Sequence, residues 1–272
     1  MSTSLFNLQN KVAAISGGTG ILGSAMAEAL AQEGVKVALL DRDPDKSTDL
    51  KEKASHNGWV IKSYKADVLD ENAMNTVQEL VLSDFKEVDI LINAAGGNMP
   101  GATIGPDEDI LALSTEETKK VLELNYLGTV IPSQVFLKSM IDNKKGCIIN
   151  ISSMSAQQPL TRVMGYSSSK AAIDNYTKWL AVELASKFGE GFRVNALAPG
   201  FFLTNQNRML LTNEDGSLTD RGKTIIEHTP FKRFGAPDEL IGTLIWLCSD
   251  ASKFITGTII PVDGGFSAFS GV

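Results

Sequence analysis

Short apolar segments alternate with longer segments of helical periodicity along almost the whole chain. The short segments lie at 12–15, 35–40, 59–64, 88–92, 147–151, 192–196 and 258–261, and the helical ones lie at 22–32, 70–86, 115–142, 166–188 and 237–249. Such alternation is typical of βαβ units, in which a helix connects two parallel strands. We therefore predict an α/β protein with a Rossmann-type, doubly wound parallel sheet of about seven strands and helices on both faces.

The chain of 272 residues contains no change of composition that would mark a linker, so we predict that 1–272 forms a single domain. One polar region, at about 201–235, interrupts the alternation of strands and helices. In doubly wound folds, ligands bind outside the carboxyl ends of the strands. We therefore expect this region to form a lid over a substrate site.

The composition argues against several classes of protein. The net charge of −7 and the isoelectric point near 5.0 disfavour a nucleic-acid partner, which requires a concentrated basic surface. Two cysteines and two histidines are too few for a disulfide framework or a metal site. The N-terminus lacks a signal-peptide pattern, and no apolar run is long enough to span a membrane. We expect a cytoplasmic protein with no membrane partner.

A glycine-rich turn lies between the first predicted strand and the first predicted helix. Gly18, Gly20 and Gly23 match the pattern G-x-G-x-x-G, in which small residues let the backbone approach a pyrophosphate at a helix N-terminus. Asp41 follows Gly18 by 23 positions and ends the second strand, where an acid accepts hydrogen bonds from the adenosine ribose. Because a carboxylate repels a 2′-phosphate, Asp41 predicts NAD(H) rather than NADP(H), although the adjacent Arg42 partly offsets the repulsion.

Tyr166 and Lys170 form a second motif, and Ser153 lies 13 positions before the tyrosine. Residues at positions i and i+4 share one face of a helix, so both side chains can point into one cleft. A phenol has a pKa near 10, and a nearby positive charge lowers that pKa toward the physiological range. The pair therefore predicts a tyrosine that serves as a general acid and base.

Further motifs accompany these two in a fixed order. They are Asp67-Val68 after the third strand, Asn93 to Gly96 after the fourth, Asn125 in the long helix, Ser153, and Pro199-Gly200. With them, the chain resembles the short-chain dehydrogenase/reductase family over essentially its whole length. The phosphate-binding loop departs from the family pattern, since Ile21 stands where the family has a glycine and Ser16 replaces a threonine.

The resemblance implies four catalytic residues: Asn125, Ser153, Tyr166 and Lys170. Ser153, or else Ser152, would bind the substrate oxygen. Tyr166 would exchange a proton with that oxygen while a hydride moves to or from the nicotinamide. Lys170 would lower the pKa of Tyr166 and hold the nicotinamide ribose, and Asn125 would fix a water molecule of a proton relay.

The resemblance also implies a set of residues that bind NAD, drawn from the loops at the carboxyl ends of the strands and from the catalytic helix. They are Gly17, Thr19, Gly20, Ile21, Leu22, Asp41, Arg42, Asp67, Val68, Asn93, Ala94, Ala95, Gly96, Tyr166, Lys170, Pro199, Gly200, Phe202 and Thr204.

Within the family, the segments 94–103, 200–208 and 263–272 are most similar to bacterial sugar-acid reductases. This similarity implies the reversible reduction of a keto-uronate, D-fructuronate, to the sugar acid D-mannonate with NADH. The residue types suit a polar anion, because arginine binds carboxylates through two parallel hydrogen bonds. The expected substrate-binding residues are Asn98, Ser153, Gln158, Arg162, Tyr166, Asn207 and Arg208.

Two alternatives remain open for the function. The substrate of the enzyme could be another sugar acid or a polyol, such as a keto-gluconate or a 4-deoxy keto-uronate. The fold could also serve a non-catalytic regulator that senses the nucleotide, since a fold alone does not fix a function.

The helices at 115–142 and 166–188 carry more apolar residues than one face of a sheet requires, among them Ile173, Tyr176 and Trp179-Leu180. Together with the family resemblance, this surplus predicts a homotetramer. The apolar C-terminal segment 266–272 could cross to a neighbouring subunit.

Overall fold

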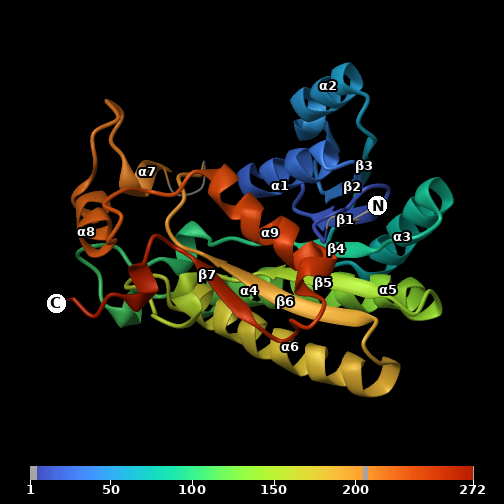
Figure 1. The fold of residues 1–272 in the computed structure, drawn as a ribbon. Helices are drawn as coiled ribbons and strands as arrows, with labels where there is room; N and C mark the ends of the chain where they lie inside the picture. Colours follow the sequence, from blue (N-terminus) through green and yellow to red (C-terminus); the bar gives the residue numbers. More distant parts are fainter. Residues whose placement is uncertain (1–4, 205–207, 272) are drawn as a thin grey trace.

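The computed structural model describes residues 5–204 and 208–271, and these contain one sheet in the order β3-β2-β1-β4-β5-β6-β7 (Figure 1). Every neighbouring pair of strands is parallel. The strands are β1 (Val12–Ser16), β2 (Lys36–Asp41), β3 (Ile61–Lys65), β4 (Ile90–Asn93), β5 (Gly146–Ile151), β6 (Phe192–Pro199) and β7 (Ile259–Val262). The predicted doubly wound parallel sheet is confirmed.

Helices connect the strands and cover both faces of the sheet. They are α1 (Ile21–Gln32), α2 (Thr48–Asn57), α3 (Glu71–Phe85), α4 (Thr115–Leu122), α5 (Gly128–Asp142), α6 (Met164–Phe188), α7 (Arg208–Leu211), α8 (Asp220–His228) and α9 (Ile241–Cys248). Most predicted elements occur within a few residues of their expected ends. Helix α2 was not predicted, and its buried residues, Leu50 and Ala54, are too few to give a clear helical pattern.

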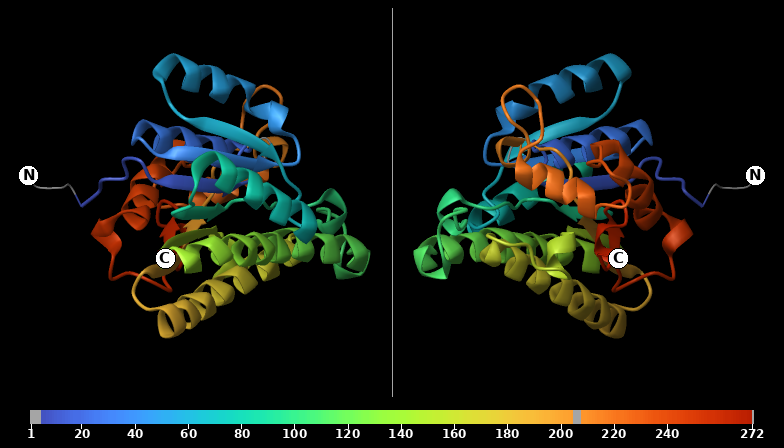
Figure 2. Two further views of the ribbon diagram at one scale, coloured as in Figure 1. Left: turned by 90° about the vertical axis from the view of Figure 1, so that its right-hand side faces the viewer. Right: turned by 90° about the vertical axis from the view of Figure 1, so that its left-hand side faces the viewer.

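Side chains alternate between the two faces along each strand. In β1, Val12 and Ala14 pack against α3, α5 and α6, whereas Ala13 and Ile15 pack against α1 and α9. The sheet therefore lies between two helical layers, which Figure 2 shows edge-on. Two apolar cores, one on each face, hold the sheet between these layers.

The carboxyl ends of the strands meet at one edge of the sheet because all the strands are parallel. The register places Ser16 opposite Asn93 and Asn93 opposite Asn150, so the carboxyl ends of β1, β4 and β5 are neighbours. The chain adds strands in opposite directions on the two sides of β1 and β4, and this switch point is where such folds bind ligands. Helices α7 and α8 belong to the polar region at 201–235, which begins and ends near a bridge between Phe202 and Gly235.

The surface of α6 differs in part from the sequence expectation. Ile173, Tyr176 and Leu180 are buried in the protein's own core, whereas Trp179 is 57% exposed and Val182 is 67% exposed. Of the four residues named in the prediction, only Trp179 therefore belongs to the unused apolar surface of α6, and Val182 joins it there. Among the described residues, no helix combines the length and apolar character needed to cross a membrane.

The described part of the C-terminal segment packs on its own chain. The ring of Phe266 lies 5.3 Å from that of Phe201, and Gln158 donates a hydrogen bond to the carbonyl of Ser267. This segment therefore covers the loops that follow β5 and β6.

Candidate active site

The glycine-rich turn after β1 adopts a compact path that excludes side chains. Gly17 has a φ of +65°, and a Cβ atom there would lie 2.8 Å from the backbone of Ala95. A Cβ atom at Gly23 would lie 2.2 Å from the carbonyl oxygen of Gly17. These two glycines let the turn, α1 and the loop after β4 approach closely.

Helix α1 begins at Ile21, directly after Gly20, whose amide donates to the carbonyl of Gly17. The residue that departs from the family pattern thus lies in the first turn of a helix, where it adopts ordinary helical backbone. Backbone N–H groups without helical partners point out of this N-terminus toward the edge of the sheet. The turn therefore fits a pyrophosphate despite Ile21.

Asp41 lies at the end of β2, beside the glycine-rich turn. Its carboxylate accepts hydrogen bonds from the amides of Thr19, at 3.3 Å, and Asp43, at 3.2 Å. Arg42 is exposed. The structure thus brings a carboxylate next to the predicted phosphate loop, as a ribose-binding acid requires.

The loop after β3 contributes Asp67 and Val68. The carboxylate of Asp67 caps the turn by accepting from the amide of Leu69 at 3.0 Å. Val68 is buried, and its side chain lies 3.0 Å from the position of a Cβ atom at Gly128. Val68 therefore packs against the start of α5 and closes this side of the switch point.

The side chain of Asn93 points into the protein rather than toward the predicted cofactor site. It is buried and donates to Ser133 and Asn150, in each case at 2.9 Å. Asn150 in turn donates to Thr177, so the amides join β4, β5, α5 and α6 beneath the site. The expected cofactor contact at Asn93 is therefore limited to its backbone, followed by the partly buried Ala94 and Ala95 and the exposed Gly96.

Asn125 lies in a π-helical segment, Glu123–Leu127, between α4 and α5. Its amide nitrogen donates to the carbonyls of Gly97 and Val121, and its amide oxygen accepts from the amide of Gly97. A π-bulge inside an α-helix commonly marks a functional position. Here it lets a fully buried asparagine hold the loop after β4.

Ser153 and Tyr166 are in contact, as the serine–tyrosine spacing predicted. Ser153 follows β5, and its hydroxyl oxygen accepts from the amide and the hydroxyl of Ser155. Burial raises the pKa of Tyr166, while a hydrogen bond with Ser153 opposes this rise. The expected lowering of the Tyr166 pKa is thus not found, because loss of solvent outweighs the favourable contacts.

Lys170 lies one turn beyond Tyr166 on α6. Its ammonium lies 5.5 Å from the centre of the Tyr166 ring and donates to the carbonyl of Ile151 at 2.8 Å. Burial lowers the pKa of Lys170 to about 8, and the negative charge of Asp174 opposes this shift. Lys170 is therefore a buried cation beside the phenol of Tyr166, one helical turn away as the i, i+4 spacing predicted.

Ser152 and Asp174 form a supporting pair that the sequence did not suggest. Both are buried, and the serine hydroxyl donates a short hydrogen bond to the Asp174 carboxylate. Asp174 lies one helical turn after Lys170, so an i, i+4 search around the lysine would have identified it. Because the hydroxyl of Ser152 donates to Asp174, Ser153 is the serine of this pair that contacts Tyr166.

The residues predicted to bind the substrate differ from one another in their contacts and exposure. Asn98 donates to the hydroxyl of Thr103 at 2.7 Å, and Gln158 is bound to the C-terminal segment. Arg162 precedes α6 and donates from Nε to the carbonyl of Ile104 at 2.6 Å. Arg208 begins α7 and is exposed, and Asn207 lies outside the described residues. The structure therefore places Arg162 near the catalytic helix and assigns Gln158 an anchoring contact.

The end of β6 approaches β7 closely, and a Cβ atom at Gly200 would lie 2.6 Å from Asp263. Beyond this point Phe202 is buried and Thr204 is partly buried.

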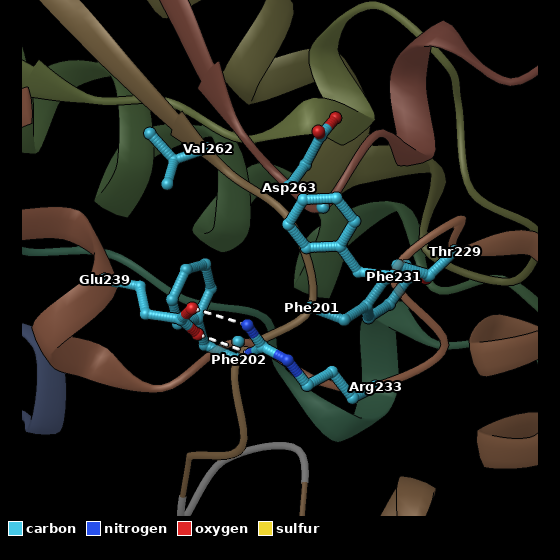
Figure 3. Close-up of a pocket in the computed structure, with 10 residues that line it drawn as sticks. Phe201, Phe202, Thr229, Phe231, Arg233, Glu239, Val262 and Asp263 are labelled. Atoms are coloured by element: carbon cyan, nitrogen blue, oxygen red, sulfur yellow. Dashed lines mark hydrogen bonds and ion pairs between the residues drawn. The ribbon is translucent and has the colours of Figure 1, made fainter.

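A cavity of about 220 Å³ lies between the polar region and the ends of β6 and β7 (Figure 3). Arg233 and Glu239 form a bidentate ion pair in its wall, with both distances 2.6 Å. Of the predicted site residues that the structure describes, Phe202 lines this cavity, whereas Ser153, Tyr166 and Lys170 do not.

Comparison with known proteins gives a consistent result. A family model described as enoyl-(acyl carrier protein) reductase matches residues 18–267. An uncharacterized oxidoreductase, UxuB, from Bacillus subtilis is 45% identical over 275 residues, with 98% of each chain covered. A 2-dehydro-3-deoxy-D-gluconate 5-dehydrogenase from Dickeya dadantii is 35% identical, with 98% of this chain and 100% of the relative covered.

A crystal structure of a protein from Haemophilus influenzae is also similar. That protein is provisionally named a D-mannonate oxidoreductase and contains bound NAD. It is 42% identical to this chain, covers 98% of each chain and superposes with a TM-score of 0.91. From the family match, these relatives, the parallel sheet and the clustered Ser153, Tyr166 and Lys170, we conclude that the chain belongs to the short-chain dehydrogenase/reductase family of oxidoreductases.

Proposed function

We propose that this protein is an NAD(H)-dependent oxidoreductase that interconverts a keto-uronate and a sugar acid, specifically D-fructuronate and D-mannonate. The observation that carries this proposal is the contact of Tyr166 with Ser153 beside the buried Lys170, at the edge of the sheet that holds the glycine-rich turn. The substrate class is supported by relatives whose names refer to D-mannonate and to a dehydro-deoxy-gluconate.

The residues divide the proton chemistry among themselves. Ser153 binds the substrate oxygen, and Tyr166 gives its proton to that oxygen during reduction or takes it during oxidation. Because burial raises the pKa of Tyr166, the phenol stays protonated near neutral pH in the free protein and is prepared to act as an acid. A bound nicotinamide supplies or accepts the hydride. Lys170 keeps a positive charge next to the phenol and stabilises the tyrosinate left after proton transfer.

NAD(H) is proposed in preference to NADP(H) because of the carboxylate at the end of β2. Asp41 lies against the amide of Thr19, within the turn that would bind the phosphates. A 2′-phosphate on the adenosine ribose would meet this negative charge directly. Arg42 is exposed and would have to turn inward to compensate.

A second candidate substrate is a keto-gluconate. The relative from Dickeya dadantii, at 35% identity, is named for action on a dehydro-deoxy-gluconate. The same catalytic residues would serve, since only the position of the carbonyl and the neighbouring hydroxyl groups differ between these acids.

The experiment that tests the proposal is a panel of keto-uronates and keto-gluconates, each assayed with NADH and with NADPH. We expect D-fructuronate with NADH to give the highest kcat/KM. Reduction of a keto-gluconate but not of D-fructuronate would leave the family chemistry intact and refute the specific substrate. A preference for NADPH would refute the argument from Asp41.

A homotetramer is also proposed, on the basis of the apolar surface that α6 leaves exposed. Trp179 and Val182 lie three positions apart on α6 and are both more than half exposed. Burial of such a face against another copy is favourable, because it removes apolar area from water. Light scattering that gives the mass of one 29.2 kDa chain would refute this assembly.

A further inference from the structure

Two arginines from distant parts of the chain meet in front of the catalytic helix. Arg221 lies on α8, and its two terminal nitrogens reach Thr161, one at 3.3 Å from the hydroxyl and the other at 3.4 Å from the carbonyl. The next residue is Arg162. Burial lowers the pKa of Arg221, and the positive charge of Arg162 lowers it further. The guanidinium group of Arg221 thus lies against the residue that directly precedes Arg162.

Within 5–204 and 208–271, no ion pair compensates these two charges. Among the ion pairs between described residues, none includes Arg162 or Arg221. Asp220, the acid next to Arg221 in sequence, pairs instead with Lys223 at 3.1 Å. Like charges held together destabilise a protein unless an anion joins them. The arrangement is therefore complementary to a ligand with a negative charge.

The backbone of Arg162 is held in an unusual conformation. Its φ is +76°, in the left-handed region that non-glycine residues rarely adopt. Two contacts with Ile104 fix it: the Ile104 amide donates to the Arg162 carbonyl at 3.0 Å, and Arg162 Nε donates to the Ile104 carbonyl at 2.6 Å. Such conformations persist where the surroundings determine them, often at ligand sites. Because Nε is the nitrogen engaged in the hydrogen bonds between described residues, we assign both terminal nitrogens of Arg162 to a ligand.

The position of the pair relates it to the catalytic centre. Helix α6 begins at Met164, and Tyr166 lies in its first turn, four positions after Arg162. Arg221 comes from the polar region expected to act as a lid. We infer that Arg162 and Arg221 together bind the carboxylate of the substrate while its carbonyl lies at Tyr166. This inference rests on the proposed function, since it concerns the acid group of the same substrate.

The pair replaces Arg208 as the second carboxylate-binding residue. A planar guanidinium fork binds a carboxylate through two parallel hydrogen bonds, and two forks can bind both of its oxygens. Arg208 is exposed and begins the four-residue helix α7, without a contact to the loop of Arg162 among the described hydrogen bonds. Variants of Arg162, Arg221 and Arg208 therefore show whether Arg221 or Arg208 is the second arginine that binds the carboxylate.

The test compares a sugar acid with a neutral polyol of the same carbon skeleton. Dissociation constants for D-mannonate and D-mannitol are measured by calorimetry on the NADH-saturated protein, in which D-mannonate cannot be oxidised. The variants are Arg162→Gln, Arg221→Gln, Arg221→Lys and Arg208→Gln. Lys223→Gln is the matched control, because it removes a positive charge from the same helix. Turnover of D-fructuronate by the wild type is recorded separately.

We expect the wild type to prefer D-mannonate, and Arg162→Gln and Arg221→Gln each to weaken its binding at least tenfold, on the order expected for lost hydrogen bonds to a charged group. Arg221→Lys should recover part of this loss, and Arg208→Gln, Lys223→Gln and all binding of D-mannitol should be unchanged. If Arg221→Gln binds D-mannonate as tightly as the wild type, the inference is wrong and the proposed function stands. If the wild type binds both compounds equally, the inference is wrong, and failure to reduce D-fructuronate would then refute the proposed function independently.

Discussion

The charge on Lys170 is the residue-scale feature on which the chemistry depends. Burial lowers the pKa of this lysine to about 8, although the negative charge of Asp174 favours the ammonium form and opposes the shift. An amine is charged below its pKa and neutral above it. The free protein should therefore lose the positive charge beside Tyr166 as the pH rises through about 8.

A pH profile tests this dependence. We expect kcat/KM for reduction to fall above about pH 8 in the wild type. Asp174→Asn should move this fall to lower pH, because it removes the charge that supports the ammonium form. The neutral amide can still accept a hydrogen bond from Ser152, so the fold should be retained. Asp49→Asn, in the first turn of the distant α2, is the control that should leave the profile in place. An unchanged alkaline limb in Asp174→Asn would contradict this role of Asp174.

At the residue scale, the directions in which side chains point could not be predicted from the sequence. The spacing of Ser153, Tyr166 and Lys170 follows from a strand end and one helical turn, so it could be predicted. The direction of Asn93 and the anchoring of Gln158 depend on contacts with residues 40 to 109 positions away. The meeting of Arg221 with the loop of Arg162 likewise spans 60 positions. Arg221 carries no local signal that would distinguish it from any exposed arginine.

At the scale of elements, the contact between the glycine-rich turn and α1 leaves no space for a side chain. Gly23 lies inside α1, yet a Cβ atom there would overlap the carbonyl oxygen of Gly17. The backbone of Gly17 cannot shift to make room without a cost in free energy, because Gly17 itself packs against the backbone of Ala95. The path of the phosphate loop therefore depends on the absence of one side chain.

Two helical glycines allow a matched comparison. Gly23→Ala should lower the free energy of unfolding by about 1–3 kcal/mol, as overpacking does, and should weaken NADH binding. In α9, a Cβ atom added at Gly242 would meet no atom within 4 Å. Gly242→Ala should therefore leave the free energy of unfolding unchanged or raise it by up to about 1 kcal/mol, because alanine has the higher helix propensity. Urea denaturation and NADH fluorescence measure both effects. Equal behaviour of the two variants would show that the close approach at Gly23 has no energetic importance.

Most helices and strands were predictable because their apolar periodicity reflects two buried faces of one sheet. Helix α2 was missed, since it buries little and lies at one side of the sheet. The π-helical segment around Asn125 was also beyond prediction in its detail. Its extra residue per turn is fixed by contacts with the Gly97 loop rather than by helix propensity.

At the scale of the whole molecule, the parallel sheet brings the functional residues together. The glycine-rich turn follows β1, Asp41 ends β2, Ser153 follows β5, and the catalytic helix lies between β5 and β6. The order of the strands could be expected once the alternation of elements and the family resemblance were recognised. The role of the region at 201–235 stays a prediction, because a lid is defined by its movement around a bound substrate.

The central claim is that this assembled site performs hydride transfer with Tyr166 as the proton donor. The direct measurement is NADH oxidation with D-fructuronate by the wild type and by Tyr166→Phe, with NADH binding measured in parallel. Tyr64→Phe is the control, since it removes a hydroxyl of the edge strand β3 that bonds Asp84 of α3. We expect Tyr166→Phe to lower kcat at least about 100-fold with NADH binding retained, and Tyr64→Phe to keep wild-type turnover. A Tyr166→Phe variant with wild-type kcat, or a wild type that binds NADH without oxidising it with any keto acid, would contradict the claim and favour a nucleotide-sensing protein.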